Sequence, residues 1–438
     1  MKLIYTPIVF LFCLYVNAQA PQKNTNESQM EKPAKVTLTN TDGKYQLFVD
    51  GKPFYIKGAG LEYGKIAAVA KHNGNSIRTW RTENGQQSGE DVLDEAQKNG
   101  LMVTMGIEVA RERHGFDYND ANAVKEQFER IKKEVLALKD HPALLIWAIG
   151  NELNLRATNP KVWDAVNDIS KMIHAVDTNH LTTTTLAGIS QQEIDLIKER
   201  CSDLDLLSVQ MYGKIIELPK MIKDFGWEGP YMVTEWGATG HWEVPKTEWG
   251  APIEENSTLK ASNYLKRYKT AIEADSLQCI GSYVFLWGQK QERTPTWYGV
   301  FLENGNETES VDVMHYLWSG TWPENRTPQV ESFVLNNKTA YEDVVLESNK
   351  EYLTSIKIRD FENDKLNYRW EILFESTDLH DGGDFENRPD AVEFTTVKVN
   401  EGILKFKAPI EKGTYRLFVY INDGQQHTAT ANIPFKVN

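Results

Sequence analysis

Between residues 54 and 318 the chain repeats one pattern, in which a short apolar run precedes a longer segment with apolar residues at helical spacing. Nearly continuous apolar runs are typical of the buried strands of a parallel sheet, and the longer segments are typical of amphipathic helices. The pattern predicts eight strand-then-helix units. They pair 54–58 with 65–72, 76–80 with 90–98, 101–109 with 123–139, 144–150 with 160–176, 181–186 with 191–200, 204–211 with 218–225, 231–234 with 259–274, and 279–286 with 311–318.

Eight such units over roughly 285 residues have the number and length of a closed (β/α)8 TIM barrel. An open, doubly wound α/β sheet is the alternative. That fold normally carries a Gly-rich phosphate loop after its first strand, whereas Gly58, Gly60 and Gly64 have a different spacing and enclose Glu62. The sequence therefore favours the closed barrel.

The segments on either side of this pattern are predicted to form β structure. Residues 45–49 and 53–56 flank Asp50-Gly51-Lys52, which is a strong hairpin signal. After Thr327 the pattern changes to short alternating segments separated by turn residues, which predicts a small all-β sandwich. The expected organisation is a barrel with an N-terminal hairpin over 35–326 and a β-sandwich over 327–438.

The first residues have the character of an export signal. Lys2 is followed by an apolar stretch over 3–16 and by small Ala18, which predicts a signal peptide over 1–18. The polar residues that follow predict a flexible tether over 19–34. The mature protein is expected to be exported, periplasmic or secreted. Lipoprotein anchoring at Cys13 is not expected, because Phe12 precedes it where a small residue is required.

Charge and composition limit the classes of partner that the protein is expected to bind. The net charge of −14 and the lack of a Lys/Arg-dense run argue against a nucleic-acid partner. No second apolar run reaches the roughly 20 residues of a membrane span, so no stable membrane insertion is expected. The 12 Trp residues are many and suggest a surface that handles flat apolar faces, such as those of sugar rings. The oligomeric state stays open.

The sequence contains only weak signals for a metal site, a cofactor or a disulfide. Cys201 and Cys279 remain after signal cleavage, and two buried free thiols are favoured over a disulfide. The histidines show no His-x-His or His-x-x-x-His spacing, so no metal site and no cofactor are predicted. Asp381-Gly-Gly-Asp384 is read as a polar turn in preference to a calcium loop.

The candidate chemistry lies where the predicted strands end. The apolar run from Leu144 to Ile149 stops at Gly150-Asn151-Glu152, and Glu235 directly follows the run 231–234. In a barrel the C-terminal strand ends face one pocket. The side chains expected there are Arg78, Trp80, Glu108, Asn151, Glu152, Tyr212, Glu235, Trp236 and Trp287.

Two buried carboxyl groups on different strands suit the cleavage of an acetal. One must protonate the leaving oxygen, and the other must attack or stabilise the oxocarbenium-like centre. Different surroundings can separate their pKa values. Arg78 and Tyr212 could keep one carboxylate ionised, while a Trp-flanked acid stays free to be protonated. The pair Glu152 and Glu235 is therefore interpreted as catalytic.

These motifs also carry a resemblance to a known family. Trp147-Ala-Ile-Gly-Asn-Glu152 and Val233-Thr-Glu235-Trp-Gly resemble the strand-four and strand-seven motifs of clan A retaining glycoside hydrolases, and the chain is most similar to the family 2 β-glycosidase barrel. Residues 75–80, Tyr212 and Trp287 match further motifs in the same order. The residues after 358 resemble immunoglobulin-like and polycystic-kidney-disease-type modules of secreted polysaccharide enzymes.

The resemblance implies roles for individual residues. Glu152 would be the general acid/base and Glu235 the nucleophile. Asn151 would bind the sugar 2-hydroxyl, and Arg78 and Tyr212 would hold the nucleophile. Trp287 would form the floor of the subsite at which the bond is cleaved. Only the tether and hairpin precede the barrel, without the β-sandwich domains of family 2 enzymes, so a single-barrel endo-enzyme or glucan transglycosylase fits the architecture equally well.

The predicted function is a retaining glycoside hydrolase acting on a β-linked oligo- or polysaccharide. The alternatives are transglycosylation on the same barrel and, least favoured, a non-catalytic carbohydrate-binding protein. For Glu108 and Glu62, ion-pair or loop roles are favoured over catalysis. His114 and His241 could line the pocket, and the loop residues Trp242, Trp249 and Trp297 are equally consistent with sugar platforms and loop anchors.

Overall fold

The computed structural model describes residues 32–62, 64–400 and 402–438. The predicted signal peptide and most of the predicted tether lie outside this part of the chain. The first described element is an antiparallel sheet of β1 (Val36–Thr41), β2 (Lys44–Val49) and β3 (Lys52–Phe54). Asp50 and Gly51 form the turn between β2 and β3 with φ of 50° and 74°, so the predicted hairpin is confirmed.

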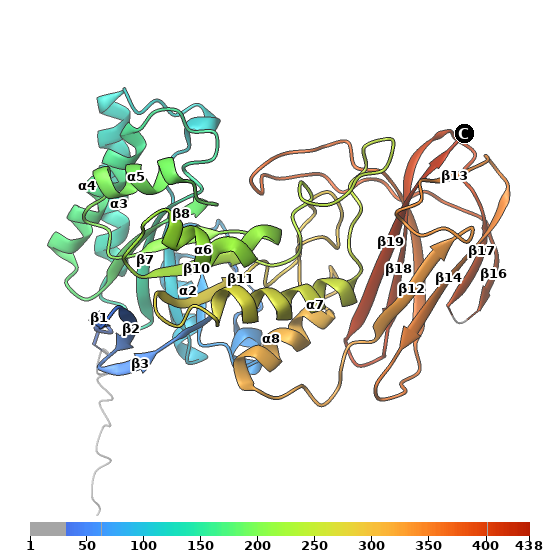
Figure 1. Ribbon diagram of the computed structural model, residues 1–438, viewed down its shortest axis with the longest axis horizontal. Coiled ribbons are helices and arrows are strands. Elements are labelled where there is room, and N and C mark those ends of the chain that lie inside the picture. Colours follow the sequence, from blue (N-terminus) through green and yellow to red (C-terminus); the bar gives the residue numbers. More distant parts are fainter. Residues whose placement is uncertain (1–31, 63, 401) are drawn as a thin grey trace, which may run out of the picture. The chain divides into compact units, whose positions relative to one another are not determined.

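Eight parallel strands close into a barrel, in the order β10-β11-β4-β5-β6-β7-β8-β9. Figure 1 shows these strands enclosed by helices. The strands are β4 (Ile56–Gly60), β5 (Ser76–Arg78), β6 (Met102–Ile107), β7 (Leu144–Asn151), β8 (Leu181–Ala187), β9 (Leu207–Gln210), β10 (Tyr231–Trp236) and β11 (Cys279–Val284). Every residue of β7 and β10 is buried, as expected for strands covered on both faces. The (β/α)8 barrel is confirmed, and the open sheet is excluded.

A helix follows each barrel strand, and side-chain caps fix several of their first residues. Ser88 and Asp91 form a capping box before α2, and the Asp120 side chain caps α3. The helices are α1 (Ile66–Lys71), α2 (Gly89–Lys98), α3 (Ala121–Leu138), α4 (Lys161–Val176), α5 (Gln191–Arg200), α6 (Leu218–Asp224), α7 (Ser257–Arg267) and α8 (Glu309–Ser319). Short helical turns lie at Glu112–His114 and Gly213–Glu217, and a π-helical turn at Tyr268–Ile272 extends α7.

The N-terminal sheet covers the bottom of the barrel. Val36 of β1 and Leu47 of β2 pack in one apolar cluster with Ile56, Leu145 and Met232, which lie at the starts of β4, β7 and β10. Higher in the barrel, the Tyr283 hydroxyl of β11 lies in the buried interior. It is 2.8 Å from the Ser76 hydroxyl and 2.6 Å from the Thr104 hydroxyl. The barrel is therefore a filled core, with its functional end at the C-terminal strand ends.

Two four-stranded sheets follow the barrel. One has the order β12 (Gln329–Leu335), β14 (Glu351–Arg359), β17 (Ile403–Lys407), β16 (Thr396–Asn400). The other has the order β13 (Val344–Leu346), β19 (Thr428–Val437), β18 (Gly413–Asn422), β15 (Asn367–Phe374). Side chains from both sheets form one core, which includes Leu335, Phe406, Leu417 and Phe435, so an all-β sandwich is confirmed. The predicted boundary at residue 327 stays a prediction.

The sandwich contacts the barrel through buried polar groups around α7. Asn432 of β19 donates to Glu254 at 2.6 Å, and Arg416 of β18 donates to the Pro252 carbonyl at 2.8 Å. The Thr430 amide donates to Ser257 at 2.9 Å. Cys201 and Cys279 are buried free thiols, as predicted. None of the described helices has the length and apolar character that a membrane crossing needs.

Candidate active site

Three side chains from two other strand ends converge on the Glu235 carboxylate. Arg78 at the end of β5 donates from Nη1 to Oε1 at 2.8 Å, and Trp80 donates from Nε1 to the same oxygen at 2.7 Å. The Tyr212 hydroxyl, just beyond β9, donates to Oε2 at 2.9 Å. Burial and the nearby Glu235 charge raise the pKa of Tyr212 well above its ordinary value, so the hydroxyl keeps its proton. Fixed donors thus engage both oxygens of the Glu235 side chain.

Arg78 also connects the two acid-bearing strands. Its side chain is 1% exposed, and Nη1 also donates to the Thr234 carbonyl at 3.1 Å. Nη2 donates to the Asn151 side-chain oxygen on β7. A planar guanidinium can serve all three acceptors at once, which a single ammonium group cannot do with the same geometry.

The Asn151 amide has a fixed orientation. Its Oδ1 accepts from Arg78, from Gln210 Nε2 at 2.7 Å and from the Thr185 hydroxyl at 3.2 Å. Arg111 Nε fixes the backbone of the same residue by donating to its carbonyl at 3.0 Å. Because these contacts engage Oδ1, Nδ2 is the donor available to a ligand.

Glu152 follows Asn151 in an unusual backbone conformation. Its φ is +52°, a left-handed value that is costly for a residue with a side chain. Gly150, two residues earlier, has φ +75°, and a Cβ there would lie 2.5 Å from Leu153. The backbone amide of Glu152 donates to the Thr185 carbonyl at 3.0 Å, which anchors this turn to β8. Strained residues of this kind concentrate at functional sites.

The two acids have different electrostatic surroundings. Among residues 32–62, 64–400 and 402–438, no hydrogen-bond donor contacts the Glu152 carboxyl group. Burial, followed by the negative charge of Glu235, raises the pKa of Glu152 to about 7, against the opposing charges of Arg113, Arg78 and Arg111. Hydrogen-bond donors therefore surround Glu235, whereas Glu152 can hold a proton near neutral pH.

The aromatic residues around Glu235 differ partly from those expected. Phe285, directly after β11, lies between Trp80 and Tyr212, with ring centroids 5.8 and 6.1 Å away. Tyr298 contacts both Phe285 and Tyr212, at 6.0 and 5.6 Å. Phe285, which was not predicted from the sequence, is therefore the strand-eight aromatic in contact with Trp80 and Tyr212, two of the residues that donate to the carboxylate.

The expectations for Trp236 and Trp287 need correction. Trp236 is buried against Tyr264 and Tyr268, on the helix side of β10, because successive side chains of a strand point to opposite faces and Glu235 points inward. Trp287 is 0% exposed and packs against Trp318 of α8 and Phe301. Both indoles belong to the layer between barrel and helices and do not contact the carboxylates.

The remaining candidates lie around the mouth of the barrel. Glu108 is exposed, and Glu62 accepts from Arg81 at 2.8 Å. Trp297 is buried and donates to the Thr239 carbonyl at 2.9 Å, which is an anchoring contact, and Trp249 is partly buried. Trp242 is 57% exposed and contacts the edge of Tyr212, with centroids 5.7 Å apart.

Of the two histidines proposed from sequence, His114 contacts the second domain and His241 contacts barrel residues. His114 lies 3.1 Å from Asp384. His241 Nδ1 lies 3.0 Å from the Tyr298 hydroxyl, and its Nε2 is 2.9 Å from Arg293. Burial, helped by Arg293, lowers the pKa of His241 to about 4, so Nε2 accepts from Arg293 and Nδ1 carries the hydrogen.

Sequence reasoning missed Arg111, Thr185, Gln210 and Phe285. Thr185 and Gln210 lie at the ends of β8 and β9, so the strand-end rule that found Asn151 also applied to them. Arg111 lies four residues beyond the end of β6, where strand position gives no signal. Phe285 was overlooked because the motif pointed to Trp287 in the same segment.

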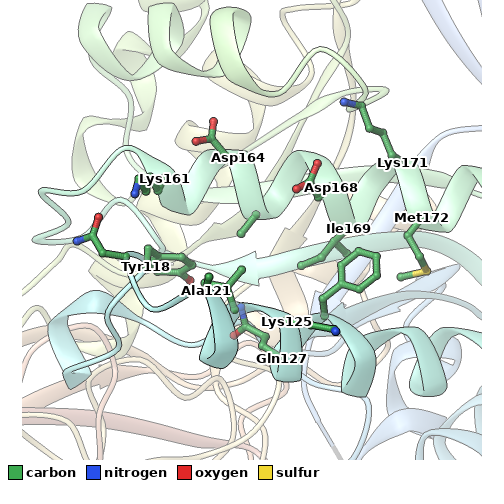
Figure 2. Close-up of a pocket in the computed structure, with 14 residues that line it drawn as sticks. Tyr118, Ala121, Lys125, Gln127, Lys161, Asp164, Asp168, Ile169, Lys171 and Met172 are labelled. Carbon is green, nitrogen blue, oxygen red and sulfur yellow. The ribbon is translucent and has the colours of Figure 1, made fainter.

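Two features away from the strand ends are not part of this site. A groove of about 680 Å³ lies between α3 and α4, and Figure 2 shows Tyr118, Lys125, Asp168 and Met172 along it. None of its lining residues contacts either carboxylate. Within the described residues, two side-chain groups could hold a metal ion, at Glu307, Asp312 and His427 and at Asp360, Glu362 and Asp364. Neither group was predicted from the sequence.

A family comparison agrees with this geometry. Residues 66–244 match the family model described as glycosyl hydrolases family 2, TIM barrel domain. The match to this family 2 domain includes Arg78, Asn151, Glu152, Tyr212 and Glu235, whereas Phe285 and the sandwich lie beyond it. No curated protein matches the chain.

Solved structures with the same fold are larger proteins. Bacteroides uniformis β-glucuronidase 2, covalently bound to cyclophellitol-6-carboxylate aziridine, aligns with 92% of this chain at 14% identity and a TM-score of 0.50. Bifidobacterium dentium β-glucuronidase, complexed with coumarin-3-O-glucuronide, aligns with 66% of it at 17% identity and a TM-score of 0.51. The chain spans about half the length of these structures, 48% and 49% respectively. These similarities show the shared fold.

Proposed function

We propose that this protein is a retaining glycoside hydrolase that cleaves β-linked glycans, with Glu235 as nucleophile and Glu152 as general acid/base. One observation carries the proposal: Arg78, Trp80 and Tyr212 donate to Glu235, whereas burial and Glu235 itself raise the pKa of Glu152 to about 7. Retaining hydrolysis needs one ionised carboxylate and one protonated acid in the same pocket. The match to the family 2 barrel domain supports the same activity.

In the first step, a Glu235 oxygen attacks the anomeric carbon and forms an ester bond. The bond from that carbon to the leaving oxygen breaks, and Glu152 gives its proton to this oxygen. In the second step, Glu152 takes a proton from water as the water oxygen attacks the anomeric carbon. The ester bond breaks, and both acids return to their starting states.

The surrounding side chains suit a cation-like transition state. Glu235 keeps its negative charge opposite the anomeric centre, and Tyr212 and Trp80 hold its two oxygens in place. The free Nδ2 of Asn151 would donate to the sugar 2-hydroxyl, an interaction that strengthens in such transition states. Phe285, in place of Trp287, would supply an apolar face at the base of the cleavage subsite.

The substrate proposed is an oligo- or polysaccharide with a β linkage. The two solved structures named above are β-glucuronidases, which is consistent with β specificity on this fold. We further propose that residues 1–18 direct export and that the sandwich is an immunoglobulin-like accessory module. The apolar stretch over 3–16 before Ala18 supports the first point, and the resemblance of the residues after 358 to immunoglobulin-like modules supports the second.

The decisive experiment compares variants of the two acids on activated donors. Glu235→Ala should lose hydrolysis of aryl β-glycosides by about 10³-fold or more. Glu152→Ala should keep much of the first step on a β-glycosyl fluoride, because fluoride needs little protonation, and azide should accelerate its turnover to a β-glycosyl azide. Near-normal turnover by Glu235→Ala, or an α-configured azide product, would overturn the assignment. Product analysis at high substrate concentration separates hydrolysis from transglycosylation.

A further inference from the structure

The connection from β15 to β16, residues 375–395, leaves the sandwich and attaches to the mouth of the barrel. We call it the β15–β16 loop. Its contacts on the barrel include residues that follow β6, β7 and β11, and two of these strands, β7 and β11, also lead to Glu152 and Phe285. The contacts are made by Asp381, Gly383, Asp384 and Glu386 of the loop.

The loop is anchored by a buried acid. The Glu386 side chain is fully buried and pairs with the Arg293 guanidinium. It also accepts from the Arg293 amide at 2.6 Å and from the His380 amide at 3.0 Å. Lys290 donates to the Gly383 carbonyl at 2.9 Å. A buried carboxylate with these partners holds the loop in one position, because separation would leave it charged and unpaired.

One set of contacts leads to Glu152. Asp384 lies 3.4 Å from the Arg113 guanidinium and 3.1 Å from His114. Gly382 packs so closely that a Cβ there would lie 2.2 Å from Arg113 Nη1. Arg113 is one of the charges that act on Glu152. The loop therefore contacts a guanidinium whose charge acts on Glu152, the proposed proton donor to the leaving group.

A second set of contacts leads to Glu235. Arg293, the partner of Glu386, donates to His241, and His241 hydrogen-bonds the Tyr298 hydroxyl. The Tyr298 ring contacts Tyr212, which donates to Glu235. One loop of the second domain thus reaches the surroundings of both acids.

Phe385 is the conspicuous side chain of this loop. It is 78% exposed, although its neighbours Asp384 and Glu386 are both paired with the barrel mouth. An aromatic ring held in solvent on an anchored loop is well placed to pack against the apolar face of a sugar. Trp242, also exposed and in contact with Tyr212, is a second such ring at the mouth.

We propose that the β15–β16 loop forms the wall of the leaving-group subsite and that Phe385 is the residue on which the leaving sugar packs. This inference rests on the proposed glycosidase function. It adds that the second domain selects substrates with sugar units beyond the scissile bond. The loop pairs with Arg156, four residues after Glu152, and the group that receives the Glu152 proton is the leaving sugar.

The test uses two probes that differ only in the leaving group. The first is the β-glycosyl fluoride of whichever sugar the wild-type protein releases from a panel of 4-nitrophenyl β-glycosides. The second is a β-linked tetrasaccharide of the same sugar. Phe385→Ala should lower kcat/KM for the tetrasaccharide about three- to tenfold more than for the fluoride, mainly through KM, which is the worth of one aromatic contact. Ile410→Ala, which removes an equally exposed side chain (75%) elsewhere on the sandwich, should change neither value.

A second variant addresses the charged contact. Asp384→Asn leaves the Arg113 charge less compensated, so it should lower the pKa of Glu152 and move the basic limb of kcat/KM to lower pH. A merely structural role of Asp384 would not move this limb. Equal losses on both probes in Phe385→Ala with an unmoved limb in Asp384→Asn would overturn the inference while leaving the glycosidase function intact. Inactivity of the wild-type protein on every β-glycoside would instead overturn the proposed function and the inference with it.

Discussion

Arg78 is the residue on which the geometry of the site depends most. It reaches Glu235 and the Thr234 carbonyl with one nitrogen and Asn151 with the other. The side chain is almost completely buried, so none of these interactions is weakened by water. A change at this position affects the Glu235 carboxylate and the Asn151 amide together.

Arg78→Lys should therefore lower kcat/KM by about 10²-fold, because one ammonium cannot hold both strands in place. The measurement is steady-state kinetics on a 4-nitrophenyl β-glycoside, with thermal unfolding of the same variant recorded beside it. A kcat/KM within twofold of wild type would show that the guanidinium does not position the carboxylate.

The raised pKa of Glu152 predicts the pH dependence. In the proposed mechanism Glu152 must be protonated in the first step, and burial and Glu235 raise its pKa to about 7. Activity on aryl glycosides should therefore fall as pH rises through about 7, since above that value the proton is lost. In Glu152→Gln, assayed on a β-glycosyl fluoride, this basic limb should disappear. Its persistence would assign the limb to another group.

At this scale the sequence predicted which strand ends carry polar side chains but did not predict the side-chain directions of their neighbours. Glu235 and Arg78 lie where expected, whereas Trp236 and Trp287 point toward the helices. A single residue of shift along a strand exchanges the two faces. The contacts of Arg111 could not be predicted, because they depend on how a loop folds back over β7.

At the scale of elements, β7 combines a buried strand with a strained end. Its residues from Leu144 to Asn151 are all buried, and the chain then turns through Glu152 at positive φ. The turn requires Gly150, whose own φ is +75° and whose missing side chain makes room for Leu153. The element thus presents Asn151 and Glu152 side by side, although neighbouring residues of a regular strand would point to opposite faces.

Gly150→Ala should destabilise the protein by about 1–3 kcal/mol and reduce activity, because it adds a clash to an unfavourable φ. Gly250→Ala is the matched control. Gly250 has φ +87°, but a Cβ there would meet nothing within 4 Å. Thermal unfolding and kcat/KM should both be lowered further in Gly150→Ala than in the control. Equal effects would mean that the contact with Leu153 is unimportant.

Element positions were predictable because each strand is a short apolar run and each helix shows apolar residues at helical spacing. The predicted segments 144–150 and 160–176 became Leu144–Asn151 and Lys161–Val176. Differences arise where tertiary contacts decide. β6 ends at Ile107, before the predicted 109, and the chain over Tyr268–Ile272 winds as a π-helical turn that no local pattern signals.

At the scale of the whole molecule, a polar network joins the sandwich to the barrel. Glu307 lies 3.1 Å from Lys71, 3.2 Å from His72 and 3.3 Å from His427 of the sandwich. Hydrogen bonds from the two histidines, helped by the Lys71 charge, outweigh burial and hold the pKa of Glu307 well below its usual range. Against the opposing effect of burial, the Glu307 contact and the Asp312 charge raise the pKa of His427.

Glu307→Gln should therefore lower the unfolding temperature by several degrees, since it leaves buried partners uncompensated. The stabilisation by Glu307 is present above about pH 4.5 and is lost as pH falls, because its folded pKa is lowered. The stabilisation by His427 is present below about pH 6.5 and is lost as pH rises, because its folded pKa is raised. The deficit should be largest at pH 5–6. The control, Glu331→Gln, changes an exposed acid on β12. A deficit that does not vary with pH would contradict this account.

Tertiary contacts between the domains could not be predicted from the sequence. Alternation after Thr327 predicted a sandwich, but it could not show that Asp384 and Glu386 reach the barrel 270 and 93 residues away in the chain. Such pairs depend on how two independently patterned segments pack together, and no local periodicity records that.

The sheet of β1–β3 across the bottom of the barrel has a consequence for how molecules reach and leave the site. In the described part of the chain, Val36, Leu47 and their apolar partners close that end, so the entrance is expected at the strand ends, beside the β15–β16 loop. With the proposed function, substrate, departing sugar and incoming water would use this entrance in turn. The residence time of the first product at this entrance would then decide whether water or another sugar reacts with the glycosyl-enzyme.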